Sequence, residues 1–194
     1  MINDVAAAGD AARLPVENAS SVVGATGRPV WLLDIDGVIN ANKPDWGAAP
    51  RRVTCAGLTI RWAPALIDRI RALHRTAAVE ICWSSTWCGY PADLADLARL
   101  LGLDLPPAFG NPPATKTCAQ QKADAAVSVL AQGRRLVWTD DEEVGIAADT
   151  HPDLAAAIAD GRALLIAPKP NRGLQPDHLT LIETFVKDSP PYAA

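Results

Sequence analysis

Residues 30–39 read Val-Trp-Leu-Leu-Asp-Ile-Asp-Gly-Val-Ile, a run of four apolar residues that leads directly into two aspartates spaced two apart. A short apolar run bounded by a glycine turn is typical of a strand buried on both faces, as in the middle of a parallel sheet. Side chains at i and i+2 of an extended chain point the same way, so Asp34 and Asp36 are predicted to emerge together at the carboxyl end of this strand. Open α/β sheets bind their ligands at that end.

The paired aspartates indicate a cation site. Two neighbouring carboxylates repel each other unless a cation or a proton lies between them, and hard carboxylate oxygens suit Mg²⁺. Asp34 and Asp36 therefore predict Mg²⁺ as the cofactor. The same residues also fit a plain polar turn after a strand, and the pair alone leaves both interpretations open.

Length and composition predict one globular domain. The chain has 194 residues, 49% of them hydrophobic and 21% charged, which is enough to bury a sizeable core. A net charge of -4 gives no indication of a general polyanion-binding surface. The four cysteines form no Cys-x-x-Cys pair and no cysteine–histidine spacing typical of zinc, so we interpret them as reduced thiols of a cytoplasmic protein.

The two ends of the chain are predicted to lie outside the domain. Residues 1–28 lack the basic start and unbroken apolar stretch of a secretory signal and are expected to form a disordered leader, and residues 188–194 a short tail. No run approaches the length of a membrane span, so no membrane partner is expected.

Apolar runs alternate with helical patterns along the rest of the chain. This alternation predicts right-handed β-α-β crossovers, hence an α/β fold with a parallel sheet and helices on both faces. Between the first two strands, a hairpin around Ala56-Gly57 is expected. The predicted strands after the first span residues 78–83, 135–139 and 163–167, and the predicted helices start at or near residues 64, 91, 117, 152 and 176.

Polar residues follow three of the four predicted strands. If the strands are parallel, Asp34/Asp36, Ser84–Thr86 and Asp140/Asp141 meet along one edge of the sheet, and Lys122 lies on the helix before the third strand. Two carboxylate groups, a hydroxyl and an ammonium are what phosphoryl transfer through an aspartyl-phosphate needs.

Each of these features also has a structural interpretation. Residues 140–143 fit an acidic helix start, residues 84–86 fit a helix cap, and Lys122 fits a surface lysine. Their conjunction with the first aspartate pair favours the active-site interpretation of all three.

In this order the motifs resemble those of the haloacid dehalogenase-like (HAD) superfamily. Trp-Ser-Ser-Thr-Trp at 83–87 and Trp-Thr-Asp-Asp-Glu at 138–142 are most similar to the compact HAD domain of bacterial multidomain RNA-repair proteins. The resemblance spans residues 29–187. It implies a HAD-like phosphatase domain with a three-layer Rossmann-like core and a minimal cap.

The resemblance also implies roles for the acidic residues. Asp34 would be the nucleophile and a Mg²⁺ ligand, and Asp36 would be the general acid/base and bind the metal through its backbone carbonyl. Asp140 and Asp141 would complete the metal site.

Two positions of this chain match the hydroxyl residue of the HAD motifs, and two match their lysine. Ser85 would provide the hydroxyl, with Ser84 as the alternative, because the register of the two serines is open. Lys122 would stabilise the phosphoryl group, with Lys116 as the alternative.

The predicted function is a Mg²⁺-dependent phosphatase, a phosphomonoester hydrolase that works through an aspartyl-phosphate on Asp34, in a monomer or small homo-oligomer. The RNA-repair resemblance suggests a polynucleotide or nucleotide phosphate end as the substrate. A small metabolite or protein phosphate, or a non-catalytic binding module, stays open as an alternative. Trp46 and Trp87 are expected either to stack on a base or to cover a core edge, and Asn171 and Arg172 to touch the substrate.

Overall fold

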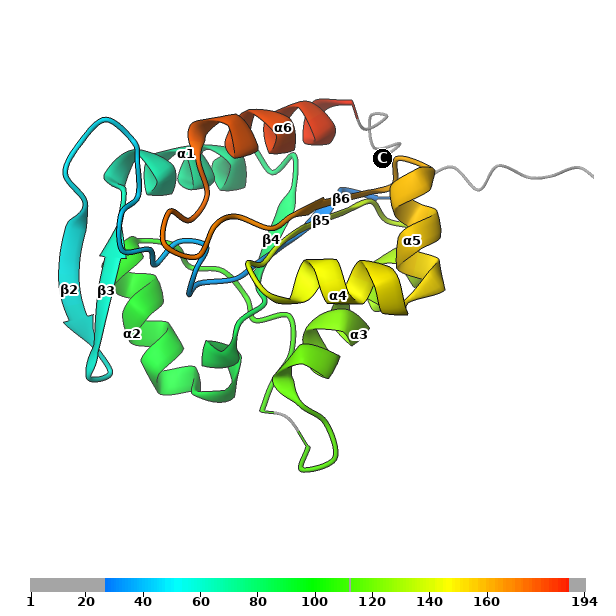
Figure 1. Cartoon of the computed structure of the whole chain (residues 1–194), viewed down its shortest axis with the longest axis horizontal. Coiled ribbons are helices and arrows are strands. Elements are labelled where there is room, and N and C mark those ends of the chain that lie inside the picture. Colours follow the sequence, from blue (N-terminus) through cyan, green and yellow to red (C-terminus); the bar gives the residue numbers. More distant parts are fainter. Residues whose placement is uncertain (1–26, 112, 189–194) are drawn as a thin grey trace, which may run out of the picture.

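A four-stranded parallel sheet runs through the molecule in the order β4-β1-β5-β6 (Figure 1). The computed structural model describes residues 27–111 and 113–188. Nearly all of the predicted leader and tail thus lie outside the described residues. The strands are β1 (Val30–Leu33), β4 (Glu80–Trp83), β5 (Leu136–Thr139) and β6 (Ala163–Ile166).

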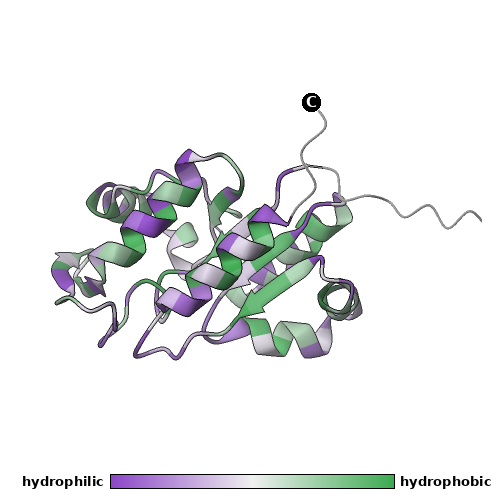
Figure 2. Cartoon of the chain, turned by 90° about the horizontal axis from the view of Figure 1, so that it is seen from above, coloured by the Kyte–Doolittle hydropathy of each residue, from purple (hydrophilic) through white to green (hydrophobic). Residues whose placement is uncertain are grey.

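Successive side chains of each strand point to opposite faces of the sheet, so a separate hydrophobic core forms on each face. Trp31 and Leu33 point into one core, whereas Val30 and Leu32 point into the other. The first core is completed by α1 (Pro64–Arg75), α2 (Pro91–Leu101) and α6 (Pro176–Lys187), and the second by α3 (Cys118–Ala131), α4 (Glu143–Thr150) and α5 (Pro152–Ala159). The predicted α/β class with helices on both faces is confirmed. In Figure 2 the visible strands of the parallel sheet are mostly hydrophobic, while the helices carry polar residues between their apolar ones.

The helix ends follow local signals in the sequence. Proline is the first residue of α1, α2, α5 and α6. An N–H at this position has no acceptor within the helix, so the missing N–H of proline costs no hydrogen bond. Gly102 ends α2 in the left-handed conformation at φ +62°. The acidic run at 140–143, which fits a helix start as well as a site, begins α4 at Glu143.

The predicted hairpin forms a second, two-stranded antiparallel sheet from β2 (Arg51–Cys55) and β3 (Leu58–Trp62). Ala56 and Gly57 at its turn both have positive φ, as a tight hairpin turn requires. Ile60 and Trp62 are buried in the first core. Figure 1 shows the hairpin beside α2, where it forms the expected minimal cap.

Among the helices of residues 27–111 and 113–188, none has the length and apolar character needed to cross a lipid bilayer.

Candidate active site

The site lies where the chain changes direction across the sheet. From β1 the chain passes to β4 on one side and then to β5 and β6 on the other, so the carboxyl ends of β1 and β5 border a crevice. Asp34 follows β1 and Asp140 follows β5. Their backbone N–H groups continue the sheet, donating to the carbonyl oxygens of Thr139 and Ile166 at 3.1 and 3.2 Å.

Three carboxylates gather at this crevice. One oxygen from each of Asp34, Asp140 and Asp141 lies within 4.8 Å of the others. Asp34 and Asp140 are buried, and Asp141 is half-buried. This geometry could hold a metal ion, because the ligand atoms are hard oxygens that converge from two neighbouring strands.

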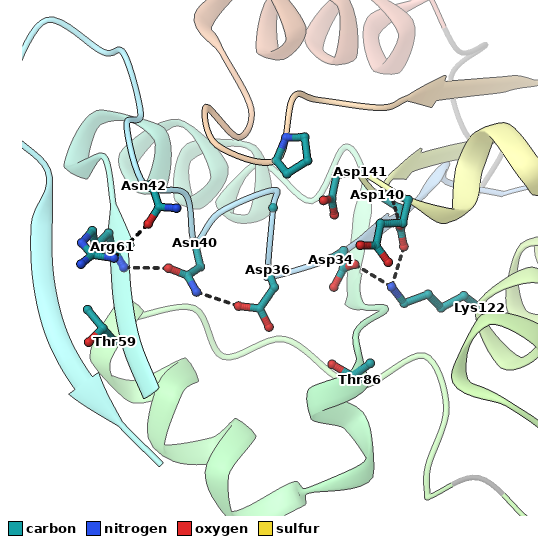
Figure 3. Close-up of a pocket in the computed structure, with 13 residues that line it drawn as sticks. Asp34, Asp36, Asn40, Asn42, Thr59, Arg61, Thr86, Lys122, Asp140 and Asp141 are labelled. Carbon is teal, nitrogen blue, oxygen red and sulfur yellow. Dashed lines mark hydrogen bonds and ion pairs between the residues drawn. The ribbon is translucent and has the colours of Figure 1, made fainter. Parts of the chain in front are cut away.

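Lys122 is the cation that the structure places against this cluster. Its Nζ donates to Asp34 Oδ2 at 2.6 Å and to Asp140 Oδ2 at 2.7 Å (Figure 3). Helix α3 delivers it, and α3 is fixed at its start by a capping box between Thr117 and Gln120. Lys116 instead forms an exposed ion pair with Asp124 at 2.6 Å. The structure therefore brings Lys122, and not Lys116, to the acidic cluster.

Burial controls the electrostatics of the cluster. It raises the pKa of Asp34 to about 7, because desolvation outweighs the attraction of Lys122. Burial also raises the pKa of Asp141. The pKa of Lys122 is lowered by burial alone, but Asp34 and Asp140 more than offset this and raise it. One ammonium thus faces three carboxylates, an arrangement that favours an additional cation.

Asp140 and Asp34 are held by backbone groups as well as by Lys122. Asp140 Oδ1 accepts the backbone N–H groups of Glu142 and Glu143, at 3.1 and 2.8 Å, at the start of α4. Asp34 Oδ1 accepts the N–H of Ile35 at 2.7 Å. The acidic run at 140–143 is therefore both a helix start and part of the site.

Gly37 makes room for Asp141. Its φ is +69°, and a Cβ at this position would lie 2.1 Å from Asp141 Oδ2. Any other residue would be strained and would also collide with that carboxylate. The glycine of the Asp-x-Asp-Gly motif is therefore required by the contact with Asp141.

Asp36 is exposed and lies apart from the buried cluster, between Asp34 and Asn40 in Figure 3. Its Oδ1 accepts from Asn40 Nδ2 at 2.6 Å, and its Oδ2 accepts from the indole Nε1 of Trp87 at 2.8 Å. Both carboxylate oxygens are thus fixed by neutral donors.

The two candidate stacking tryptophans have structural partners. The ring of Trp87 is buried under Asp36. Trp46 is half-buried, and its Nε1 donates to the Leu174 carbonyl at 2.8 Å. These hydrogen bonds favour the expectation that the two rings cover an edge of the core, and not that they stack on a base.

The hydroxyls after β4 fall into two groups. Ser84 and Ser85 are fully buried, and neither Oγ has a hydrogen-bond partner among the described residues. Both serines follow β4, which pairs with β1, and the Ser84 N–H donates to the Leu33 carbonyl at 2.9 Å, next to Asp34 in the sequence. Thr86 is exposed and lines the pocket, as Figure 3 shows.

An open pocket of about 380 Å³ extends from the acidic cluster to the hairpin. Sequence reasoning did not identify several of its lining residues, Asn40, Asn42, Thr59, Arg61 and Pro170. Strand alternation in the expected hairpin puts Thr59 and Arg61 on one face. No sequence signal shows that this face turns toward Asp36.

Asn171 and Arg172 are not among the residues that line this pocket. The Asn171 carbonyl accepts the Lys43 N–H at 2.8 Å, and Arg172 pairs with Asp45 at 3.4 Å. These contacts join the loop after β6 to the loop after β1, and Pro170 is the residue of that loop which reaches the pocket.

Comparison with known proteins identifies the family of this chain. Residues 30–179 match the family model described as the HAD domain in Swiss Army Knife RNA repair proteins. Neither a search of curated proteins nor one of solved structures gave a match. The matched range includes all three strand ends that form the site. The chain belongs to the family of HAD domains found in Swiss Army Knife RNA repair proteins.

Proposed function

We propose that this chain is a Mg²⁺-dependent phosphatase that hydrolyses phosphomonoesters through an aspartyl-phosphate on Asp34. Its substrate is a phosphate end of a nucleotide or polynucleotide, in keeping with the RNA-repair context of the family. The observation that carries the proposal is a buried carboxylate, Asp34, bonded to a lysine and grouped with two further acids at the floor of an open pocket.

The residues of the cluster fit a magnesium ion. Three carboxylates converge within 4.8 Å of one another, and a single ammonium balances them only in part. Asp34, Asp140 and Asp141 would hold the ion by their side chains, and Asp36 by its backbone carbonyl. A bound Mg²⁺ would screen the charge between the nucleophile and the phosphate.

In the first step an Asp34 oxygen forms a bond to phosphorus as the ester P–O bond breaks. Asp36 would act as the general acid and give a proton to the leaving alkoxide. A water then attacks the same phosphorus, and Asp36 takes the proton of that water. The P–O bond to Asp34 breaks, which releases inorganic phosphate and restores the carboxylate.

Lys122 and Ser85 would stabilise the phosphoryl group. The Lys122 ammonium already lies 2.6 Å from Asp34, so it is close to any charge that develops on a group bonded there. Ser85 follows β4, the strand that pairs with β1, and its buried hydroxyl has no hydrogen-bond partner among the described residues. It would need to become accessible to contact a phosphoryl oxygen, because it does not line the pocket.

The direct test is metal removal from the wild-type protein. Hydrolysis of an aryl phosphate is expected in the presence of Mg²⁺, and chelation should lower its rate by at least about a hundredfold, because metal stabilisation of the transition state is worth several kcal/mol. Release of inorganic phosphate measures this. Equal rates with Mg²⁺ and with chelator would overturn the metal dependence.

Trp87 is expected to orient Asp36 for proton transfer. Trp87→Phe keeps an aromatic ring but removes the N–H that lies 2.8 Å from Asp36 Oδ2. We expect kcat to fall about tenfold with little change in KM, since one positioning hydrogen bond is lost. Trp46→Phe is the matched control, because its N–H donates to the Leu174 carbonyl instead. Equal kcat values for the two variants would contradict this role of Trp87.

Gly37→Ala is expected to damage the metal site more than the fold. The added methyl would meet the Asp141 carboxylate at 2.1 Å and displace it. We expect Mg²⁺ binding, measured by calorimetry, to weaken about tenfold, because one ligand is misplaced.

Gly47→Ala provides a matched control for this variant. Gly47 has a similar φ of +72° with nothing within 4 Å, so alanine there adds backbone strain without a collision. If both variants bind Mg²⁺ equally well, Asp141 is not a ligand.

A further inference from the structure

The hairpin presents two arginines to each other near the end of the pocket that lies away from Lys122. In the β2–β3 register Arg52 lies directly opposite Arg61, on the face that also carries Thr54 and Thr59. Thr59 and Arg61 line the pocket. Like charges directly opposite each other destabilise an antiparallel pair, so this pairing calls for an explanation outside the hairpin itself.

Neither arginine of this pair has a carboxylate partner in the described part of the chain. Within residues 27–111 and 113–188, neither Arg52 nor Arg61 forms an ion pair. Arg61 Nη1 donates to the neutral amide oxygen of Asn42, at 3.0 Å (Figure 3). Arg52 is exposed. An uncompensated pair of guanidinium groups in an acidic chain is suited to an external anion.

Arg61 and the acidic cluster line one cavity, and Arg52 lies across the hairpin from Arg61. The pocket is lined by Lys122 and Asp34 at one end and by Asn42, Thr59 and Arg61 at the other. The planar guanidinium group matches the geometry of a phosphate and binds it with two parallel hydrogen bonds. A substrate that carries its scissile phosphate at Asp34 can therefore bring a second phosphate to the hairpin.

The two ends of the pocket are also joined by hydrogen bonds. The backbone N–H of Arg61 donates to Asn40 Oδ1 at 2.8 Å, and Asn40 Nδ2 donates to Asp36 Oδ1 at 2.6 Å. The Asn40 side chain thus links the backbone of the hairpin to the Asp36 carboxylate. A change of the Arg61 side chain leaves those contacts in place.

We propose that Arg61, with Arg52 beside it, binds the phosphodiester next to the scissile phosphate, so that the preferred substrate is a phosphorylated polynucleotide end. This proposal rests on the proposed phosphatase function. It goes further, because it assigns the preference for a polynucleotide over an isolated monoester to a specific pair of residues.

The test compares a dinucleotide that carries a terminal phosphate, at the 3′ or the 5′ end, with a nucleoside monophosphate and an aryl phosphate. In the wild type, kcat/KM should be highest for the dinucleotide. Arg61→Gln should lower the ratio of dinucleotide to monophosphate kcat/KM about tenfold, mainly through KM, and Arg52→Gln about threefold. The preference should also weaken with added salt, less steeply in Arg61→Gln.

The control is Arg75→Gln, which removes one exposed arginine at the end of α1, away from the pocket. It should leave the ratio of the two kcat/KM values unchanged. A ratio in Arg61→Gln within twofold of the wild type would overturn the proposal. A second result would also overturn it. In that result the wild type hydrolyses a phosphopeptide with a single phosphate as fast as the dinucleotide, and Arg61→Gln lowers the two rates equally.

Direct binding separates this proposal from the phosphatase function. Calorimetry with the phosphorylated dinucleotide should show a Kd about tenfold weaker for Arg61→Gln than for the wild type. If the wild type hydrolyses no ester but this difference persists, the phosphatase function fails while the phosphate subsite stands. If hydrolysis is normal but binding and ratio do not change, only the subsite fails. Because Arg52 and Arg61 repel each other, Arg61→Gln should not lower the Tm.

Discussion

Asp34→Asn should lower Mg²⁺-dependent hydrolysis of an aryl phosphate by about four orders of magnitude, which is the loss expected when a nucleophile is removed from a catalytic unit. The amide of asparagine is a poor nucleophile, so no aspartyl-phosphate can form. The fold should persist, because Lys122 keeps its 2.7 Å bond to Asp140. Initial rates at saturating substrate measure the effect, and labelled phosphate should remain on the wild-type protein after a rapid quench but not on the variant.

Asp104→Asn provides the matched control for the loss of a carboxylate. Asp104 is exposed and lies outside the residues that line the pocket, so this variant should keep the wild-type rate. A rate in Asp34→Asn within tenfold of the wild type would exclude Asp34 as the nucleophile. Hydrolysis would then have to proceed by direct attack of water.

Lys122→Met should remove activity and also destabilise the metal-free protein. Without the ammonium, the buried carboxylates of Asp34 and Asp140 lose the bonds that they make at 2.6 and 2.7 Å. Breaking such a buried pair costs about 3 kcal/mol, which corresponds to a fall in Tm of about 10 °C for a domain of this size. Scanning calorimetry of the metal-free protein measures the fall.

Added Mg²⁺ should restore part of the stability of Lys122→Met. A cation bound by the three acids compensates the same charges that the ammonium compensates, so Mg²⁺ should raise the Tm more in this variant than in the wild type. Lys116→Met is the control, since its ion pair with Asp124 is half-exposed and contributes less than about 1 kcal/mol. Equal Tm values for the two lysine variants would contradict the buried position of Lys122.

Much of the fold can be predicted from short stretches of the sequence. Residues 30–33 are apolar at every position because both faces of β1 are covered, and the prolines at 64, 91, 152 and 176 mark helix starts by removing an N–H that a helix start does not use. Helix α4 was harder to predict. It begins where the Asp140 carboxylate accepts two backbone N–H groups, and the same carboxylate serves the site.

The candidate site could be predicted from sequence only in part. The strand ends identify Asp34, Asp140 and Asp141, because parallel strands bring their carboxyl ends to one edge. They do not distinguish Lys122 from Lys116. Lys116 lies before the Thr117 N-cap, whereas Lys122 lies within α3. The packing of that helix on the sheet is what brings Lys122 to Asp34.

By itself, the sequence determined the strands, the order of the motifs and the two-residue spacing that places Asp34 and Asp36 at one edge, because these depend on short-range periodicity. Only the tertiary structure decided which residues complete the site. The contacts of Trp87 with Asp36, of Gly37 with Asp141 and of Arg61 with Asn40 join residues that are 51, 104 and 21 positions apart in the sequence. Such contacts depend on how helices and hairpin pack on the sheet, and no local pattern encodes that packing.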